Sequence, residues 1–187
     1  MLVDRTLVQD NSNAPSYRVA VYQQGLQEAD GETRKELKNR HNEDQYCKFA
    51  KNGILVAGVF DGNGGTPYFR DMKGESGACL GAKAVKEFIE GIEPQDGYEN
   101  YRWYALSGAN SYLRTVMKKN DVDISDPKSL WNVSAALITC HRAAGYFEYA
   151  IIGNCLIMVI KTDGSWEVFT GNSGNCEGAL NGCEESL

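Results

Sequence analysis

The sequence contains no long apolar run. No stretch approaches the ~20 consecutive apolar residues that a membrane-spanning helix requires. The first five residues, Met1-Leu2-Val3-Asp4-Arg5, lack the apolar centre of a secretory signal peptide. We therefore expect no membrane partner, and a cytoplasmic, intracellular protein without a signal peptide.

Positive charge is scarce. The 19 Lys and Arg residues are outnumbered by 25 Asp and Glu residues, which gives a formal net charge of −6. The one basic run, residues 34–40, is interrupted by Glu36. An acidic chain without a continuous basic patch is poorly suited to bind polyanions. We expect no nucleic-acid partner.

Cysteine and histidine do not have the spacing of a zinc site. The six cysteines are dispersed without closely spaced pairs, and the two histidines, His41 and His141, stand alone in separate contexts. Zinc sites and small disulfide frameworks both require closely grouped ligands or cysteine patterns. This distribution favours a reducing cytosol and excludes the common zinc motifs.

The length and apolar content of the chain suit one folded domain. Apolar residues make up 42% of the 187 residues, enough for a single sizeable core, and there is no internal repeat. We expect one domain over residues 1–187. Residues 171–187 are rich in glycine and asparagine, which predicts a flexible tail.

The apolar periodicity predicts strands and helices in a mixed order. Helices are predicted over 76–90 and 99–119, and we expect the tyrosines of the second helix, Tyr101, Tyr104 and Tyr112, in the core. Antiparallel strands that follow a pair of helices indicate a layered α+β domain. The predicted strands are 16–23, 45–50, 54–60, 133–142, 146–152, 156–161 and 165–170.

The most informative stretch is an uncharged run, 54–60, that ends in Asp61 and a glycine-rich turn. The turn Lys51-Asn52-Gly53 predicts that strand 45–50 folds back on this run as a hairpin. The hairpin would bring Glu43 and Asp44 close to Asp61. Carboxylate oxygens suit Mg²⁺ or Mn²⁺ better than zinc.

Two motifs on this hairpin resemble the type 2C family of metal-dependent protein serine/threonine phosphatases. They are Asn42-Glu43-Asp44 and Val59-Phe60-Asp61-Gly62-Asn63-Gly64-Gly65. A third match combines residues 134–139 with residues 149–155, which resemble a small-residue strand and the family's Gly-Asp-Ser turn. The chain resembles a divergent or truncated member of that family.

The resemblance implies a fold and a chemistry. The fold is an antiparallel β-sandwich flanked by helices in α-β-β-α layers, with the C-terminal part absent if the chain is truncated. Asp61 would bridge two Mg²⁺ or Mn²⁺ ions, Glu43 and the carbonyl of Gly62 would each bind an ion, and Asp44 would hold metal-bound water. A metal-activated water would then hydrolyse phosphoserine or phosphothreonine in a phosphoprotein substrate.

Several positions depart from the family pattern. Asn63 stands where the family has a histidine proposed to protonate the leaving alcohol, and an amide cannot deliver a proton. Asn154 replaces the aspartate of the Gly-Asp-Ser turn. The phosphate-binding arginine is expected at Asn39, so Arg40, one residue along, is its stand-in. The family's two C-terminal metal aspartates have no convincing equivalent.

These departures leave three alternatives open. The chain is an active phosphatase with a degenerate site, a pseudophosphatase that binds a protein partner without hydrolysis, or a fragment of a longer enzyme. The loss of the histidine and of three aspartates favours the second alternative. The joint retention of Glu43, Asp44 and Asp61 favours an enzyme, because nothing structural requires three acidic residues there.

Overall fold

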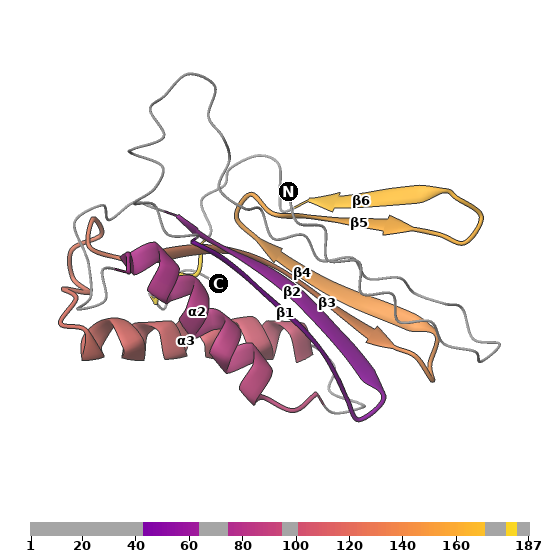
Figure 1. The fold of residues 1–187 in the computed structure, drawn as a ribbon, viewed down its shortest axis with the longest axis horizontal. Coiled ribbons are helices and arrows are strands. Elements are labelled where there is room, and N and C mark those ends of the chain that lie inside the picture. The colour runs from indigo at the N-terminus through magenta and orange to yellow at the C-terminus, as the bar shows by residue number, and fades with distance from the viewer. Residues whose placement is uncertain (1–42, 64–74, 95–100, 171–178, 183–187) are drawn as a thin grey trace, which may run out of the picture.

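The computed structural model of the protein describes residues 43–63, 75–94, 101–170 and 179–182 (Figure 1). The predicted strand 16–23 lies outside the described residues. Within the described part, no helix is long and apolar enough to cross a membrane.

Four antiparallel strands form the main sheet in the order β1-β2-β3-β4. Their bounds are β1 (Asp44–Lys51), β2 (Ile54–Asn63), β3 (Asn132–His141) and β4 (Tyr146–Ile152). A separate two-stranded hairpin consists of β5 (Leu156–Ile160) and β6 (Trp166–Thr170). The strand β2 runs three residues past the predicted end at Phe60, because β3 supplies backbone partners as far as Asn132.

The turn between β1 and β2 has the predicted form. Asn52 and Gly53 both have positive φ, 52° and 76°, and Lys51 pairs directly with Ile54. A two-residue turn of this kind requires positive φ at both central residues, which explains the Asn-Gly pair. The Nδ2 atom of Asn52 also donates to the carbonyl of Pro94 at 3.1 Å, which ties the turn to the end of the following helix.

Two helices cover one face of the main sheet: α2 (Gly77–Gly91) and α3 (Tyr101–Lys119) (Figure 1). Every second residue of each strand faces them, as the pleat requires. Side chains from both layers form one buried core. Its members include Val56, Phe60, Val85, Ile89, Leu106, Leu113, Trp131, Leu137 and Ala150.

One predicted core position on α3 is wrong. Tyr101 is buried and Tyr112 packs partly buried against the core, but Tyr104 is 56% exposed. The buried stripe of α3 runs instead through Leu106 and Met117. A position three residues after Tyr101 lies at the side of that stripe, since the helix repeats every 3.6 residues.

The hairpin β5–β6 lies on the face of the sheet opposite the helices (Figure 1). The ring of Phe169 on β6 packs against Phe147 and Tyr149 on β4, with centroid separations of 6.1 and 4.5 Å. The α+β class with antiparallel sheets and two helices is confirmed. Within the described ranges, helices cover only the α2–α3 side, so the outer helical layer of the α-β-β-α arrangement is not seen there.

Part of the predicted flexible tail is held in place. Leu180 is fully buried and exchanges two backbone hydrogen bonds with Val133, at 2.9 and 3.0 Å. The Oδ1 atom of Asn110 accepts from the backbone N–H groups of Asn181 and Gly182 at 3.0 and 2.8 Å. Residues 179–182 therefore differ from the flexible tail predicted over 171–187, because one apolar side chain and two backbone donors find partners in the fold.

Candidate functional site

The hairpin brings the predicted acidic residues Asp44 and Asp61 together. They are direct partners in the antiparallel register of β1 and β2. Direct partners project to the same face of a sheet, with β-carbons roughly 4.5–5.5 Å apart. Both side chains are half-buried, and they lie on the face opposite α2 and α3.

The electrostatics of this pair match its geometry. Burial, the charge of Asp61, a hydrogen bond with Asp61 and the charge of Glu43 raise the pKa of Asp44 to about 6. Two neighbouring carboxylates disfavour each other's ionisation. A divalent cation would relieve this repulsion, and oxygen ligands suit the hard cations Mg²⁺ and Mn²⁺.

Gly62 brings the site against the first turn of α2. A β-carbon at this position would lie 2.3 Å from the carbonyl oxygen of Ala78 and 2.9 Å from that of Glu43. The backbone N–H of Gly62 donates to the Glu43 carbonyl at 3.3 Å. The glycine predicted from the motif is therefore required here by close packing between the strand and the helix.

Glu43 is directed to the helix side of the sheet. The hydroxyl of Ser76 donates to its Oε1 at 2.5 Å. The same hydroxyl oxygen accepts from the backbone N–H of Cys79 at 3.2 Å and so caps the N-terminus of α2. Consecutive residues of an extended strand point to opposite faces, which separates the carboxylate of Glu43 from that of Asp44.

The third matched segment also reaches the acidic pair. Ser134 on β3 is the direct partner of Asp61. A β-carbon at Gly153 would lie 2.4 Å from Ser134 Oγ, so the turn after β4 packs closely against this strand. Burial and the charges of Asp61 and Asp44 raise the pKa of the Cys155 thiol to about 12, so the thiol lies within electrostatic range of the pair.

Some predicted site residues are not tested by the structure. Arg40 lies outside the described residues, and of Asn63 only the backbone is described, paired with Asn132 at the end of β2. Within the described ranges, no three His, Cys, Asp or Glu side chains are grouped closely enough to hold a metal ion. The predicted convergence of three carboxylates is therefore not seen, and the metal-ligand roles of Glu43, Asp44, Asp61 and Gly62 remain predictions.

Sequence reasoning missed two groups at this site. Ser76 is the first residue of the predicted helix 76–90, and a serine at a helix start was the available signal, but its bond to Glu43 joins residues 33 positions apart. Cys155 is the last residue of the segment 149–155, which resembles the family's third motif. Its thiol approaches the pair only because β4 returns alongside β3.

Comparisons with known proteins give one structural match. No family model matches the chain, and a search of curated proteins found no relative. The structure is similar to that of RsbX in complex with magnesium, with a TM-score of 0.47 and 16% sequence identity. The similarity covers 75% of this chain and 55% of the RsbX chain. Similarity at this level does not show that the chain belongs to a family.

Proposed function

We propose that this chain is a divergent type 2C-like phosphatase that hydrolyses phosphoserine or phosphothreonine in proteins with Mg²⁺ or Mn²⁺. The observation that carries the proposal is the pairing of Asp44 with Asp61 at the ends of two strands. The electrostatics agree, since burial together with neighbouring acidic charge raises the pKa of Asp44 to about 6. A cytoplasmic location and a phosphoprotein partner belong to the same proposal.

The residues have distinct roles in this proposal. Asp61 and Asp44 would supply carboxylate oxygens for a divalent cation, and the family resemblance adds the carbonyl of Gly62 and the carboxylate of Glu43, which would have to turn from Ser76 to reach it. When bound, such a cation polarises a phosphoryl group and lowers the pKa of water. Arg40 would pair with phosphate oxygens through its planar guanidinium group.

Asn63 determines which substrates react well. An amide donates a hydrogen bond but supplies no proton to a leaving alkoxide. General acid catalysis contributes about 10²–10⁴-fold where a leaving group needs a proton. Alkyl phosphoesters such as phosphoserine should therefore be cleaved more slowly than aryl phosphates, whose leaving groups depart without protonation.

The proposal is tested by Mn²⁺-dependent hydrolysis of para-nitrophenyl phosphate and a phosphoserine peptide. Asp61→Asn should abolish activity that rises with Mn²⁺. Asp121→Asn is the matched control, because Asp121 is exposed and its φ of 55° is tolerated by asparagine. Asn63→His should raise cleavage of the phosphopeptide at least ten times more than cleavage of the aryl phosphate. Equal effects on both substrates would exclude the role given to Asn63.

A second function, a pseudophosphatase that binds a protein partner, is favoured by one observation. The Ser76 hydroxyl engages the carboxylate of Glu43 on the helix side of the sheet, away from Asp44 and Asp61. An absence of Mn²⁺-dependent turnover in both the native chain and Asn63→His would favour this function. Turnover that disappears in Asp61→Asn would exclude it.

A further inference from the structure

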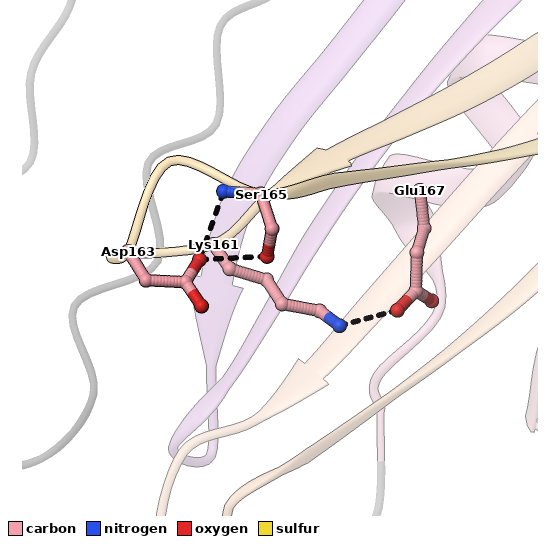
Figure 2. Close-up of polar contacts among 4 residues, drawn as sticks. All are labelled: Lys161, Asp163, Ser165 and Glu167. Atoms are coloured by element: carbon pink, nitrogen blue, oxygen red, sulfur yellow. Dashed lines mark hydrogen bonds and ion pairs between the residues drawn. The ribbon is translucent and has the colours of Figure 1, made fainter.

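The hairpin β5–β6 has polar groups at its tip and along one side. Figure 2 shows the Oδ1 atom of Asp163 accepting from the backbone N–H and the hydroxyl of Ser165, at 2.8 and 2.6 Å. Lys161 forms an ion pair with Glu167 across the two strands (Figure 2). The side chain of Glu167 shares its face of the hairpin with Phe169, two residues along β6, and this face is the one that packs on the main sheet.

The other face of the hairpin is apolar and exposed, and we name it the outer apolar face. The register pairs Met158 with Val168 and Ile160 with Trp166, so these side chains project together. All of its large apolar members are at least 40% exposed. They are Leu156 (55%), Met158 (55%), Ile160 (70%), Trp166 (65%) and Val168 (40%).

This distribution departs from the usual one for a surface strand pair, because the fully solvent-facing side is apolar. Polar residues normally face solvent and apolar residues face the core. Here Lys161 and Glu167 lie on the side of Phe169, while no charged residue lies on the outer apolar face. A contiguous exposed apolar patch of this kind is typical of an interaction surface. A two-stranded sheet is also only marginally stable until a further layer covers it.

We propose that the outer apolar face binds a second copy of this chain, with the two hairpins packed face to face around a twofold axis. Such an interface is isologous, which means that the same patch of both copies is in contact. Each outer apolar face would therefore be covered by an equally apolar surface. The net charge of −6 makes two copies repel each other at long range, so they can approach most closely through a face that carries no charged side chain, as the outer apolar face does.

The exposed apolar area indicates how strongly the two copies should bind each other. Five large side chains, each about half exposed, leave about 500 Å² of apolar surface on each copy. Two copies would bury about 1,000 Å², which is below the standard interface of about 1,600 Å² and typical of a weak, reversible dimer. We therefore expect dissociation in the micromolar range rather than a permanent dimer.

The test is sedimentation velocity of the full 187-residue chain from about 1 to about 200 µM. The mass should rise from 20.6 kDa towards twice that value. Ile160→Lys should raise the concentration at the midpoint at least tenfold, because it places two positive charges in the apolar contact. Tyr104→Lys is the matched control, since Tyr104 is 56% exposed on α3, away from the hairpin, and this variant should leave the midpoint unchanged.

Two further measurements keep the test independent of folding defects. Ile160→Thr retains a β-branched residue suited to a strand and should still weaken the dimer. The native chain should show a blue shift of tryptophan emission with rising concentration, and Trp166→Phe should remove that shift while the dimer mass persists. Dimerisation should be unchanged by EDTA, because it does not depend on a metal ion.

A native chain that remains a monomer over the whole range would overturn the proposal. A dimer weakened equally by Tyr104→Lys and Ile160→Lys would also overturn it, because the contact would then not be specific to the outer apolar face.

Discussion

Ser76 makes two hydrogen bonds with different consequences. Its oxygen caps α2 by accepting from the N–H of Cys79, and its hydroxyl hydrogen is donated to Glu43. If Glu43 turns to bind a cation as proposed, Ser76 is the partner that would orient its carboxylate, and the loss of such a partner typically lowers metal affinity about 10–100-fold. Ser76 therefore couples the start of the helix to the candidate site.

Variants at Ser76 separate these two bonds. Ser76→Gly should weaken Mn²⁺ binding about tenfold, with only a small loss of unfolding free energy because glycine is an acceptable N-cap. Ser76→Ala should weaken binding equally and also cost about 1 kcal/mol of stability. Ser76→Thr keeps both bonds and should resemble the native chain. Isothermal titration and urea unfolding measure the two effects, and tighter Mn²⁺ binding by Ser76→Gly would contradict this expectation.

A substitution at Gly62 tests whether the candidate site depends on the close contact between β2 and α2. Gly62→Ala places a methyl group 2.3 Å from the carbonyl oxygen of Ala78, so strand and helix must separate. We expect a loss of about 1–3 kcal/mol in unfolding free energy, as for other overpacked positions. Gly91→Ala, where a β-carbon has no neighbour within 4 Å, is the control and should be neutral or slightly stabilising. Equal free energies of unfolding for the two variants, measured with urea, would contradict close packing of Gly62 against the Ala78 carbonyl.

At the scale of elements, the segment 179–182 extends the main sheet. Val133 pairs with Gly62 on one side and exchanges hydrogen bonds with Leu180 on the other. The pairing of β4 with β3 ends at Ile152, opposite Ala135, and Leu180 pairs with β3 two residues further on, at Val133. A short segment late in the chain thus supports the strand next to the candidate site.

Leu180→Ala should destabilise the whole domain. The side chain is fully buried, and truncation of a buried leucine to alanine usually costs about 2–5 kcal/mol. Leu156→Ala, at an exposed position of the hairpin, is the control and should cost less than about 1 kcal/mol at a concentration where the chain is monomeric. Urea midpoints give the comparison. An unchanged midpoint for Leu180→Ala would show that this segment is not part of the cooperative fold.

At the scale of the whole molecule, the core holds ionisable groups in their neutral form. Burial raises the pKa of the Cys47 thiol to about 12 and that of the Cys140 thiol to about 11. Burial, with a smaller contribution from Cys47, raises the pKa of Tyr101 to about 12. The ordinary values are 9.0 for the thiols and 10.0 for tyrosine.

These shifts predict a loss of stability in alkaline solution. Above pH 9 the unfolded chain releases thiol and phenol protons that the folded chain keeps, so the free energy of unfolding falls as the pH rises. The urea midpoint should decline between about pH 9 and pH 11. Tyr101→Phe should reduce the decline above pH 10, and it should fold well because the buried Tyr101 hydroxyl has no hydrogen-bond partner among the residues that the structure describes. A midpoint that is constant or rises over this interval would contradict the prediction.

The sequence by itself determined the hairpin and its acidic pair. A two-residue Asn-Gly turn fixes the register of the strands that it joins, so Lys51 opposite Ile54 already implies Asp44 opposite Asp61. The helices over α2 and α3 and the four later strands were predicted within one or two residues, because their apolar periodicities are regular. Local rules were sufficient wherever the partners are close in the chain.

Only the tertiary structure decided what surrounds that pair. The bond from Ser76 to Glu43, the position of Cys155 and the burial of Leu180 each join segments that meet only through strand pairing and through packing of the sheet with the helices. The same packing directed Glu43 to the helix side and Asp44 to the other face, so the expected group of three carboxylates became a pair. Contacts between distant segments depend on how whole layers fit together, and no local pattern specifies that fit.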